Sequence, residues 1–212
     1  NGNDAGKVNS PFIITLTFTL SDYNGVNVSC NSSSDGTIDL TPAAGTAPYT
    51  FLWSTGATSE DLSGIPSGTY TVTVTDFLGD VQTGSVTLIA PSPLSVVQDS
   101  VNTAGCNGGT DGAAYISVTG GVSGFTYLWS DASSNEDLTN VSAGAYNVTV
   151  TDVNSCTSQL NVDIFEDPFL TLQLIDTDVS CNGAATGAIN LTVNGGVPSF
   201  TYNWSNGSAN ED

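Results

Sequence analysis

A single repeat runs through the whole chain, and it limits the fold more than any other feature. The tryptophans Trp53, Trp129 and Trp204 are separated by 76 and 75 residues. Three further residue types keep the same two intervals: Cys30, Cys106 and Cys181; Gly36, Gly112 and Gly187; Asp61, Asp137 and Asp212. Because four residue types share one register, the chain consists of tandem copies of one unit of about 75 residues.

The repeating unit is built from short alternating segments. Residues 69–75 read Thr-Tyr-Thr-Val-Thr-Val-Thr, which is the pattern of a half-buried strand. Gly, Asn, Asp and Ser separate such segments, and no segment combines helical periodicity with helix caps. The pattern predicts an all-β chain of tandem Ig-like β-sandwich repeats, with six or seven short strands in each.

The register of the repeats predicts the domain boundaries. Residues 1–10 are polar and form a tail or linker, and residues 11–92 form the first Ig-like repeat. Residues 93–167 form the second repeat, and 168–212 form a partial third repeat that lacks its final strands. We expect this third repeat to leave a sheet edge and part of its core uncovered.

Charge excludes several classes of partner. The chain has 21 acidic residues against one basic residue, Lys7, and a formal net charge of −20. Nucleic acid is excluded as a partner because phosphate contacts require Lys and Arg. An anionic membrane surface repels such a chain, and no run reaches the roughly 18 apolar residues of a membrane span. We therefore expect neither nucleic-acid binding nor membrane insertion.

The residues needed for common catalytic mechanisms are missing. A nucleophile needs a neighbouring base, yet the chain has no His and a single Lys. Paired carboxylates act in glycosidases, but no pair here comes with a predicted apolar cleft. The sequence therefore predicts a protein that is not an enzyme.

The order of motifs resembles a known repeat family. The first two units read Cys…Asp-Gly, Gly-Gly, aromatic-Thr-Tyr-x-Trp-Ser, Glu-Asp-Leu and Gly-x-Tyr-x-Val-Thr-Val-Thr-Asp, with small variations, and the third unit follows this string as far as Glu-Asp. Over about residues 26–212 this string resembles the SprB repeat, found in giant cell-surface adhesins of gliding Bacteroidetes and in related secreted proteins. The resemblance implies an Ig-like fold, export to the cell surface or extracellular space, adhesion or filament formation, and no catalytic residues.

Cysteines in an exported chain predict disulfides. The second repeat holds both Cys106 and Cys156, and a bond between them closes a loop of about 50 residues, to which loop-closure entropy assigns about 4 kcal/mol. In the first repeat Asp80 occupies the position of Cys156, so Cys30 has no partner inside its repeat. Cys181 would need a partner beyond Asp212. The alternative is that all four cysteines are buried thiols.

Aromatic residues recur at fixed positions and are candidates for the core. Alternation along a strand places Tyr49, Phe51 and Trp53 on one face, and the Gly-x-Tyr motif adds another ring. The predicted core rings are Trp53, Trp129, Trp204, Tyr70 and Tyr146. The alternative is a row of exposed rings that stack on sugars, as in a carbohydrate-binding module of a secreted multidomain protein.

Acidic turns raise the question of calcium. Calcium needs six to eight oxygen ligands from a compact loop, and no acidic turn has the spacing of an EF-hand or of the nonapeptide calcium repeat. Asp76 and Asp80 are the weak candidates for a calcium site. Capping of turns by Asp is the favoured interpretation, and we expect no other cofactor or metal.

Glycosylation is expected in an exported chain of this composition. Asn27, Asn147 and Asn190 each begin an Asn-x-Ser/Thr sequence. Ser100 lies in Asp-Ser-Val, which resembles the O-glycosylation motif reported for Bacteroidetes. These four residues are the candidate sites.

Two structural roles fit the repeats. The first is an adhesin stalk, in which repeats in series project or form an adhesive surface, with surface polysaccharide as a candidate ligand. The second is a filament of self-associating subunits. Here the alternating residues Ile14, Leu16, Phe18 and Leu20 are a candidate donor strand for the third repeat of a neighbour. The connection from Pro11 to Cys30 spans 19 residues, against 13 in the other repeats.

Overall fold

The computed structural model describes residues 13–105 and 108–212, and every regular element in these ranges is a β-strand. The chain forms two compact units. The first contains the described residues up to Val96 together with 118–126 and 150–158. The second contains the described residues of 97–117 together with 127–149 and 159–212. The predicted all-β class is confirmed.

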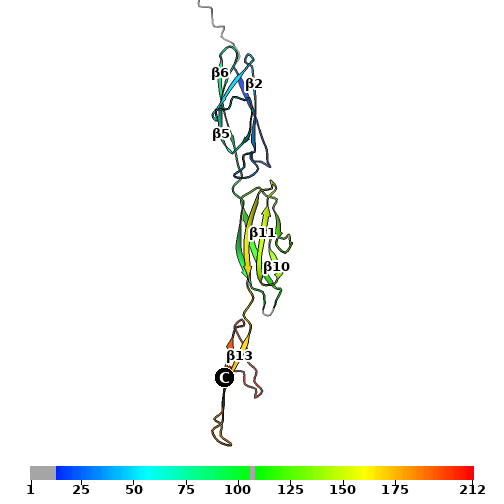
Figure 1. Cartoon of the computed structure of the whole chain (residues 1–212), viewed down its shortest axis with the longest axis vertical. Coiled ribbons are helices and arrows are strands. Elements are labelled where there is room, and N and C mark those ends of the chain that lie inside the picture. Colours follow the sequence, from blue (N-terminus) through cyan, green and yellow to red (C-terminus); the bar gives the residue numbers. More distant parts are fainter. Residues whose placement is uncertain (1–12, 106–107) are drawn as a thin grey trace, which may run out of the picture. The chain divides into compact units, whose positions relative to one another are not determined.

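The first repeat is a sandwich of two three-stranded sheets (Figure 1). One sheet has the order β1-β2-β4 and the other β3-β5-β6, and neighbouring strands are antiparallel. These sheets match the ABE and CFG strands of an Ig-like domain. The strands are β1 (Thr15–Leu20), β2 (Gly36–Ala43), β3 (Thr50–Trp53), β4 (Leu62–Ile65), β5 (Gly68–Thr75) and β6 (Val81–Leu88).

The second repeat has the same two sheets, in the orders β10-β8-β7 and β12-β11-β9. Its strands are β7 (Ser95–Asn102), β8 (Gly112–Thr119), β9 (Thr126–Trp129), β10 (Leu138–Val141), β11 (Gly144–Thr151) and β12 (Thr157–Ile164). In the third repeat, β13 (Thr171–Thr177) and β14 (Ala188–Asn194) form a two-stranded antiparallel sheet. Tandem Ig-like sandwiches are therefore confirmed.

The predicted aromatic core is found in the first two repeats. Trp53 and Trp129 are each 2% exposed. The indole N–H of Trp53 donates to the Ser59 carbonyl oxygen and that of Trp129 to the Asn135 carbonyl oxygen, both at 3.0 Å. In the third repeat the indole N–H of Trp204 makes the same bond to Asn210 at 2.8 Å, but its ring is only half-buried.

A tyrosine at the start of one strand in each sandwich fixes the preceding corner. The Tyr70 hydroxyl donates to the Pro66 carbonyl oxygen at 2.7 Å, and the Tyr146 hydroxyl donates to the Ser142 carbonyl oxygen at 3.0 Å. Tyr70 is buried and Tyr146 half-buried. This bond, four residues back along the chain, is the tyrosine corner of Ig-like domains, so these two residues are packing residues as predicted.

The candidate donor strand belongs to its own repeat. β1 pairs with β2 from Thr15↔Ala43 to Leu20↔Ile38. Ile14 is buried in the core of the first repeat, and Leu16, Phe18 and Leu20 pack against that core. The Phe18 ring meets Trp53 edge-on, with centroids 6.4 Å apart. The prediction that these residues are offered to a neighbour is therefore wrong, because their apolar face is already used.

Strand direction places two connections at opposite ends of the first sandwich. β2 and β5 end at the same end of the sandwich, because the N–H of Thr46, after β2, donates to Asp76, after β5. β4 runs antiparallel to β2 and β3 antiparallel to β5, so β3 and β4 run in the same direction. The β1–β2 connection lies beside the end of β6, where the Asn27 N–H donates to the Ile89 carbonyl oxygen at 2.8 Å. The β5–β6 turn lies at the start of β6, and eight strand residues span roughly 26 Å.

Candidate functional site

An aspartate organises the turn between the last two strands of each sandwich. The Asp76 carboxylate accepts hydrogen bonds from the backbone N–H groups of Thr46, Leu78 and Asp80, each at 2.9 Å. Asp76 is only 6% exposed. Its carboxylate therefore ties the β2–β3 connection to the β5–β6 turn, which is the capping role favoured by the sequence.

The same bonds set the acidity of Asp76. The Thr46 N–H is the main cause that lowers the pKa of Asp76 below its ordinary value. Burial raises this pKa, and the N–H groups of Asp80, Leu78 and Gly79 lower it further. Because donors surround the charged form, Asp76 is an anion that the fold needs.

The second repeat builds the same turn on Asp152. This buried carboxylate accepts from the N–H groups of Val122 at 3.0 Å, Asn154 at 2.9 Å and Cys156 at 2.8 Å. Residues 152–156 thus repeat the backbone bonds of residues 76–80. The side chains differ, since Leu78 and Asp80 are replaced by Asn154 and Cys156.

Cys156 forms a disulfide with Cys30, across a sequence separation of 126 and with a Cα–Cα distance of 5.7 Å. Both residues belong to the first compact unit. The bond joins the β1–β2 connection of the first repeat to the β11–β12 turn of the second. The predicted pairing of Cys156 with Cys106 is wrong. Cys106 itself lies outside the described residues.

The β7–β8 connection, as far as Ala104, lies at the opposite end of β12 from Cys156. The Ala104 N–H donates to the Phe165 carbonyl oxygen at 2.9 Å, just after the end of β12. Cys156 immediately precedes the start of β12. Eight strand residues advance the chain by roughly 26 Å, whereas a disulfide needs Cα atoms within about 7 Å.

The longer connection of the first repeat makes further contacts with the same turn. Asn24 and Gly25 form a tight turn with φ of 57° and 93°, closed by the Tyr23 N–H to the Val26 carbonyl oxygen at 2.7 Å. The Asn154 amide donates to the carbonyl oxygens of Tyr23 at 3.0 Å and Ser29 at 3.2 Å. It also accepts from the Asn24 amide at 2.6 Å. The extra residues therefore serve a contact with the second repeat.

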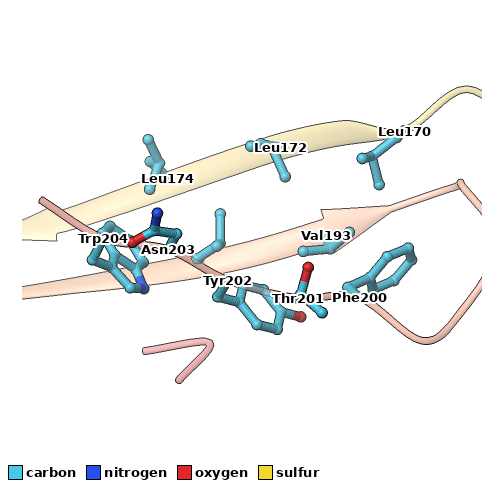
Figure 2. A pocket seen from close by; sticks show the side chains of 10 residues that line it. Leu170, Leu172, Leu174, Val193, Phe200, Thr201, Tyr202, Asn203 and Trp204 are labelled. Carbon is cyan, nitrogen blue, oxygen red and sulfur yellow. The ribbon is translucent and has the colours of Figure 1, made fainter. Parts of the chain in front are cut away.

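The third repeat has an open apolar face. Leu170, Leu172 and Leu174 lie side by side along β13 and the residue before it, facing rings from the segment after β14 (Figure 2). Leu172 and Leu174 are 62% and 59% exposed. Val193, Phe200, Tyr202 and Trp204 also line this hollow. In the first repeat the equivalent face is covered by the second sheet.

The candidate modification sites differ in exposure. Ser100 and Asn190 are exposed, whereas Asn27 and Asn147 are half-buried. The Asn27 amide donates to the Ser21 carbonyl oxygen at 2.9 Å, and the Asn147 amide donates to Asn161 at the same distance. Glycosylation at these four residues stays a prediction, and the two half-buried amides are the less accessible.

The acidic and cysteine side chains are the candidates for metal ligands and for free thiols. Within residues 13–105 and 108–212, no group of three or more acidic, Cys or His side chains is arranged to hold a metal ion. The calcium expectation at Asp76 and Asp80 stays a prediction, although backbone donors already occupy the Asp76 carboxylate. Among the described cysteines, Cys181 is exposed and outside any disulfide.

Comparison with known families settles what the repeats are. The SprB repeat family model matches three segments, residues 23–58, 100–134 and 176–209. The chain carries three SprB repeats. Each SprB match starts at or shortly after the end of the first strand of a unit and ends in the turn after its tryptophan, so the resemblance seen in the sequence is confirmed. No curated protein matches the chain.

Several solved structures are similar to the SprB repeats at low identity. The three N-terminal domains of the bacteriophage RB49 Highly Immunogenic Outer Capsid protein share 15% identity, covering 88% of this chain and 71% of that one, with a TM-score of 0.48. The N-terminal eight Ig domains of Down Syndrome Cell Adhesion Molecule isoform 1.30.30 share 12%, covering 73% and 25%, with a TM-score of 0.39. The amphioxus IgVJ-C2 molecule shares 13%, covering 71% and 96%, with a TM-score of 0.28.

No helix long and apolar enough to cross a membrane occurs in the described part of the chain.

Proposed function

We propose that this chain is a non-enzymatic extracellular segment that acts as the stalk of a surface adhesin. The observation that carries the proposal is the Cys30–Cys156 disulfide, which joins two consecutive SprB repeats covalently. Disulfides persist in oxidising compartments outside the cytosol. A bond between repeats, rather than inside one, serves the joining of repeats in series.

The buried side chains support a structural role over sugar recognition. Trp53 and Trp129 are in the core, so the first two repeats do not offer these rings as a platform for sugars. A carbohydrate-binding module would need other aromatic residues on its surface. Surface polysaccharide stays a candidate ligand of the stalk, through residues other than these tryptophans.

A second candidate function is assembly into filaments. The apolar face of β13 and β14 favours it, because exposed apolar surface of this kind promotes association. With residues 14–20 used inside the first repeat, such a filament would need strands other than β1 to cover the face. Electron microscopy of native material separates the candidates: ordered fibres favour assembly, and irregular single arms favour a stalk.

Surface labelling, thiol alkylation and gene deletion test the proposed location and role. Antibodies raised against the chain should label intact cells that produce it, and alkylation before lysis should leave Cys30 and Cys156 unmodified because they are bonded. Deletion of the coding region should reduce attachment of those cells to surfaces. A chain found in the cytosol with all four thiols reactive would overturn the proposal.

A further inference from the structure

We propose that the Cys30–Cys156 bond carries tension past residues 31–155, so that most of the two sandwiches lies on a closed loop that pulling does not extend. Force applied to the two ends of a chain follows its shortest covalent path. Here that path crosses from Cys30 to Cys156, whose Cα atoms are 5.7 Å apart. This inference deepens the proposed stalk function by naming the part of the stalk that bears load.

The bypassed loop holds the strands from β2 to β11. Both cores depend on these strands, since Trp53 and Trp129 lie on β3 and β9. Extension requires the two ends of a segment to separate, and the disulfide holds these ends together. Tension therefore does not unravel the loop while the bond is intact.

Within the two sandwiches, the load falls on two edge strands instead. β1 is the edge of the order β1-β2-β4, and β12 is the edge of the order β12-β11-β9. Each of these strands is held in its sheet by one ladder only. Detaching either one leaves the other strands of its sheet paired, so the parts that yield first are those whose loss disturbs the sandwich least.

Contour length gives a direct measure of the bypass. A separation of 126 residues corresponds to roughly 420–450 Å of extended chain. The oxidised chain should be shorter by that length than the reduced chain when both are fully stretched. A bond between Cys106 and Cys156 would hide only about 170–180 Å, so the two pairings give separable values.

Optical tweezers with handles at the two ends of the 212-residue chain test the proposal. We expect Cys30→Ser to add roughly 420–450 Å to the stretched length, and Cys106→Ser and Cys181→Ser to add nothing. Treatment of the unmutated chain with a phosphine reductant should add the same length as Cys30→Ser. Full stretching gives this result even for a variant that does not fold.

Two results would overturn the proposal. One is an unchanged length after reduction, which would mean that no bond bypasses the loop. The other is a gain with Cys106→Ser and none with Cys30→Ser, which would place the bond inside the second repeat. Both are measured on purified chain, so they leave the extracellular location untouched. Failure of the cell-labelling experiment would in turn leave the contour length unchanged.

Discussion

The β5–β6 turn of the first repeat and the β11–β12 turn of the second share a backbone and differ in what their side chains meet. Asp76 and Asp152 each accept three backbone N–H groups. The two turns differ in the side chain two residues after the aspartate. Leu78 is 57% exposed, whereas Asn154 forms hydrogen bonds with three groups of the first repeat. The comparison separates residues that build the sandwich from residues that join one sandwich to the next.

Removal of the disulfide should have the largest effect. Cys156→Ser should lower the free energy of unfolding by about 2–5 kcal/mol, because the bond restricts a long loop in the unfolded chain. Asp80→Ser, at the matching position of the first repeat, should change it by less than about 0.5 kcal/mol. Denaturant unfolding under non-reducing conditions measures both. Equal free energies of unfolding for the two variants would mean that the disulfide at the second turn does not stabilise the chain.

The capping aspartates should come next, and here the two turns should behave alike. Asp152→Ala should cost about 2–4 kcal/mol, because three backbone N–H groups lose a charged acceptor that is itself buried. Asp76→Ala should destabilise the first repeat for the same reason. Urea unfolding of each variant is the measurement. A loss at one turn only would contradict the equivalence of their backbones.

Acid should weaken the first turn in a defined direction. The folded-state pKa of Asp76 lies below the unfolded value of about 3.9. The stabilisation is therefore complete above the unfolded pKa and is lost as pH falls through the folded one. A carboxyl ¹³C titration by NMR should place the Asp76 midpoint below its ordinary value, and Asp76→Asn should make stability depend less on pH in this range. A midpoint at or above the ordinary value would show that the three donors do not favour the anion.

The amide contacts between repeats should contribute less than the capping bonds. Asn154→Leu copies the first repeat and should cost about 1–2 kcal/mol through the loss of its hydrogen bonds. The reverse change, Leu78→Asn, should stay within about 0.5 kcal/mol because Leu78 is exposed. Thermal unfolding of the oxidised chain compares them. If neither substitution changes the unfolding temperature, the disulfide alone stabilises the contact between the two repeats.

The smallest effect should be a gain. Ser155 has φ of 70°, in the left-handed region, where the first repeat has Gly79 with φ of 88°. Ser155→Gly should stabilise the second repeat by about 0.5–1 kcal/mol, because glycine adopts this conformation without strain. Gly79→Ser should cost a similar amount. Differential scanning calorimetry can resolve such shifts, and a loss with Ser155→Gly would point to an unseen role for the Ser155 hydroxyl.

The fold could be read from the sequence because its signals are local and repeated. Alternation of Tyr70, Val72 and Val74 predicts a strand with one buried face, and these side chains are in the core. The tryptophans were predicted correctly for the first two repeats because both repeats contain the second sheet. Trp204 is half-buried, since the strands that cover Trp53 have no counterpart among the described residues of the third repeat.

The disulfide could not be predicted by alignment alone, because its partner depends on strand direction. If all six strands of a sandwich alternated in direction, the first connection and the last turn would lie at one end. In the first repeat β3 and β4 run the same way, so the first connection and the last turn lie at opposite ends. One signal was available: Cys30 had no partner in its own repeat, and its connection was six residues longer than the others.

That longer connection shows how an array of this kind can vary. The Asn24–Gly25 turn is inserted between strands whose pairing it does not alter. Residues added there, together with one cysteine after the Tyr strand of the following copy, join two copies by a disulfide and by side-chain hydrogen bonds. These few residues thus decide whether two neighbouring copies are crosslinked, while both sandwiches keep the same sheets.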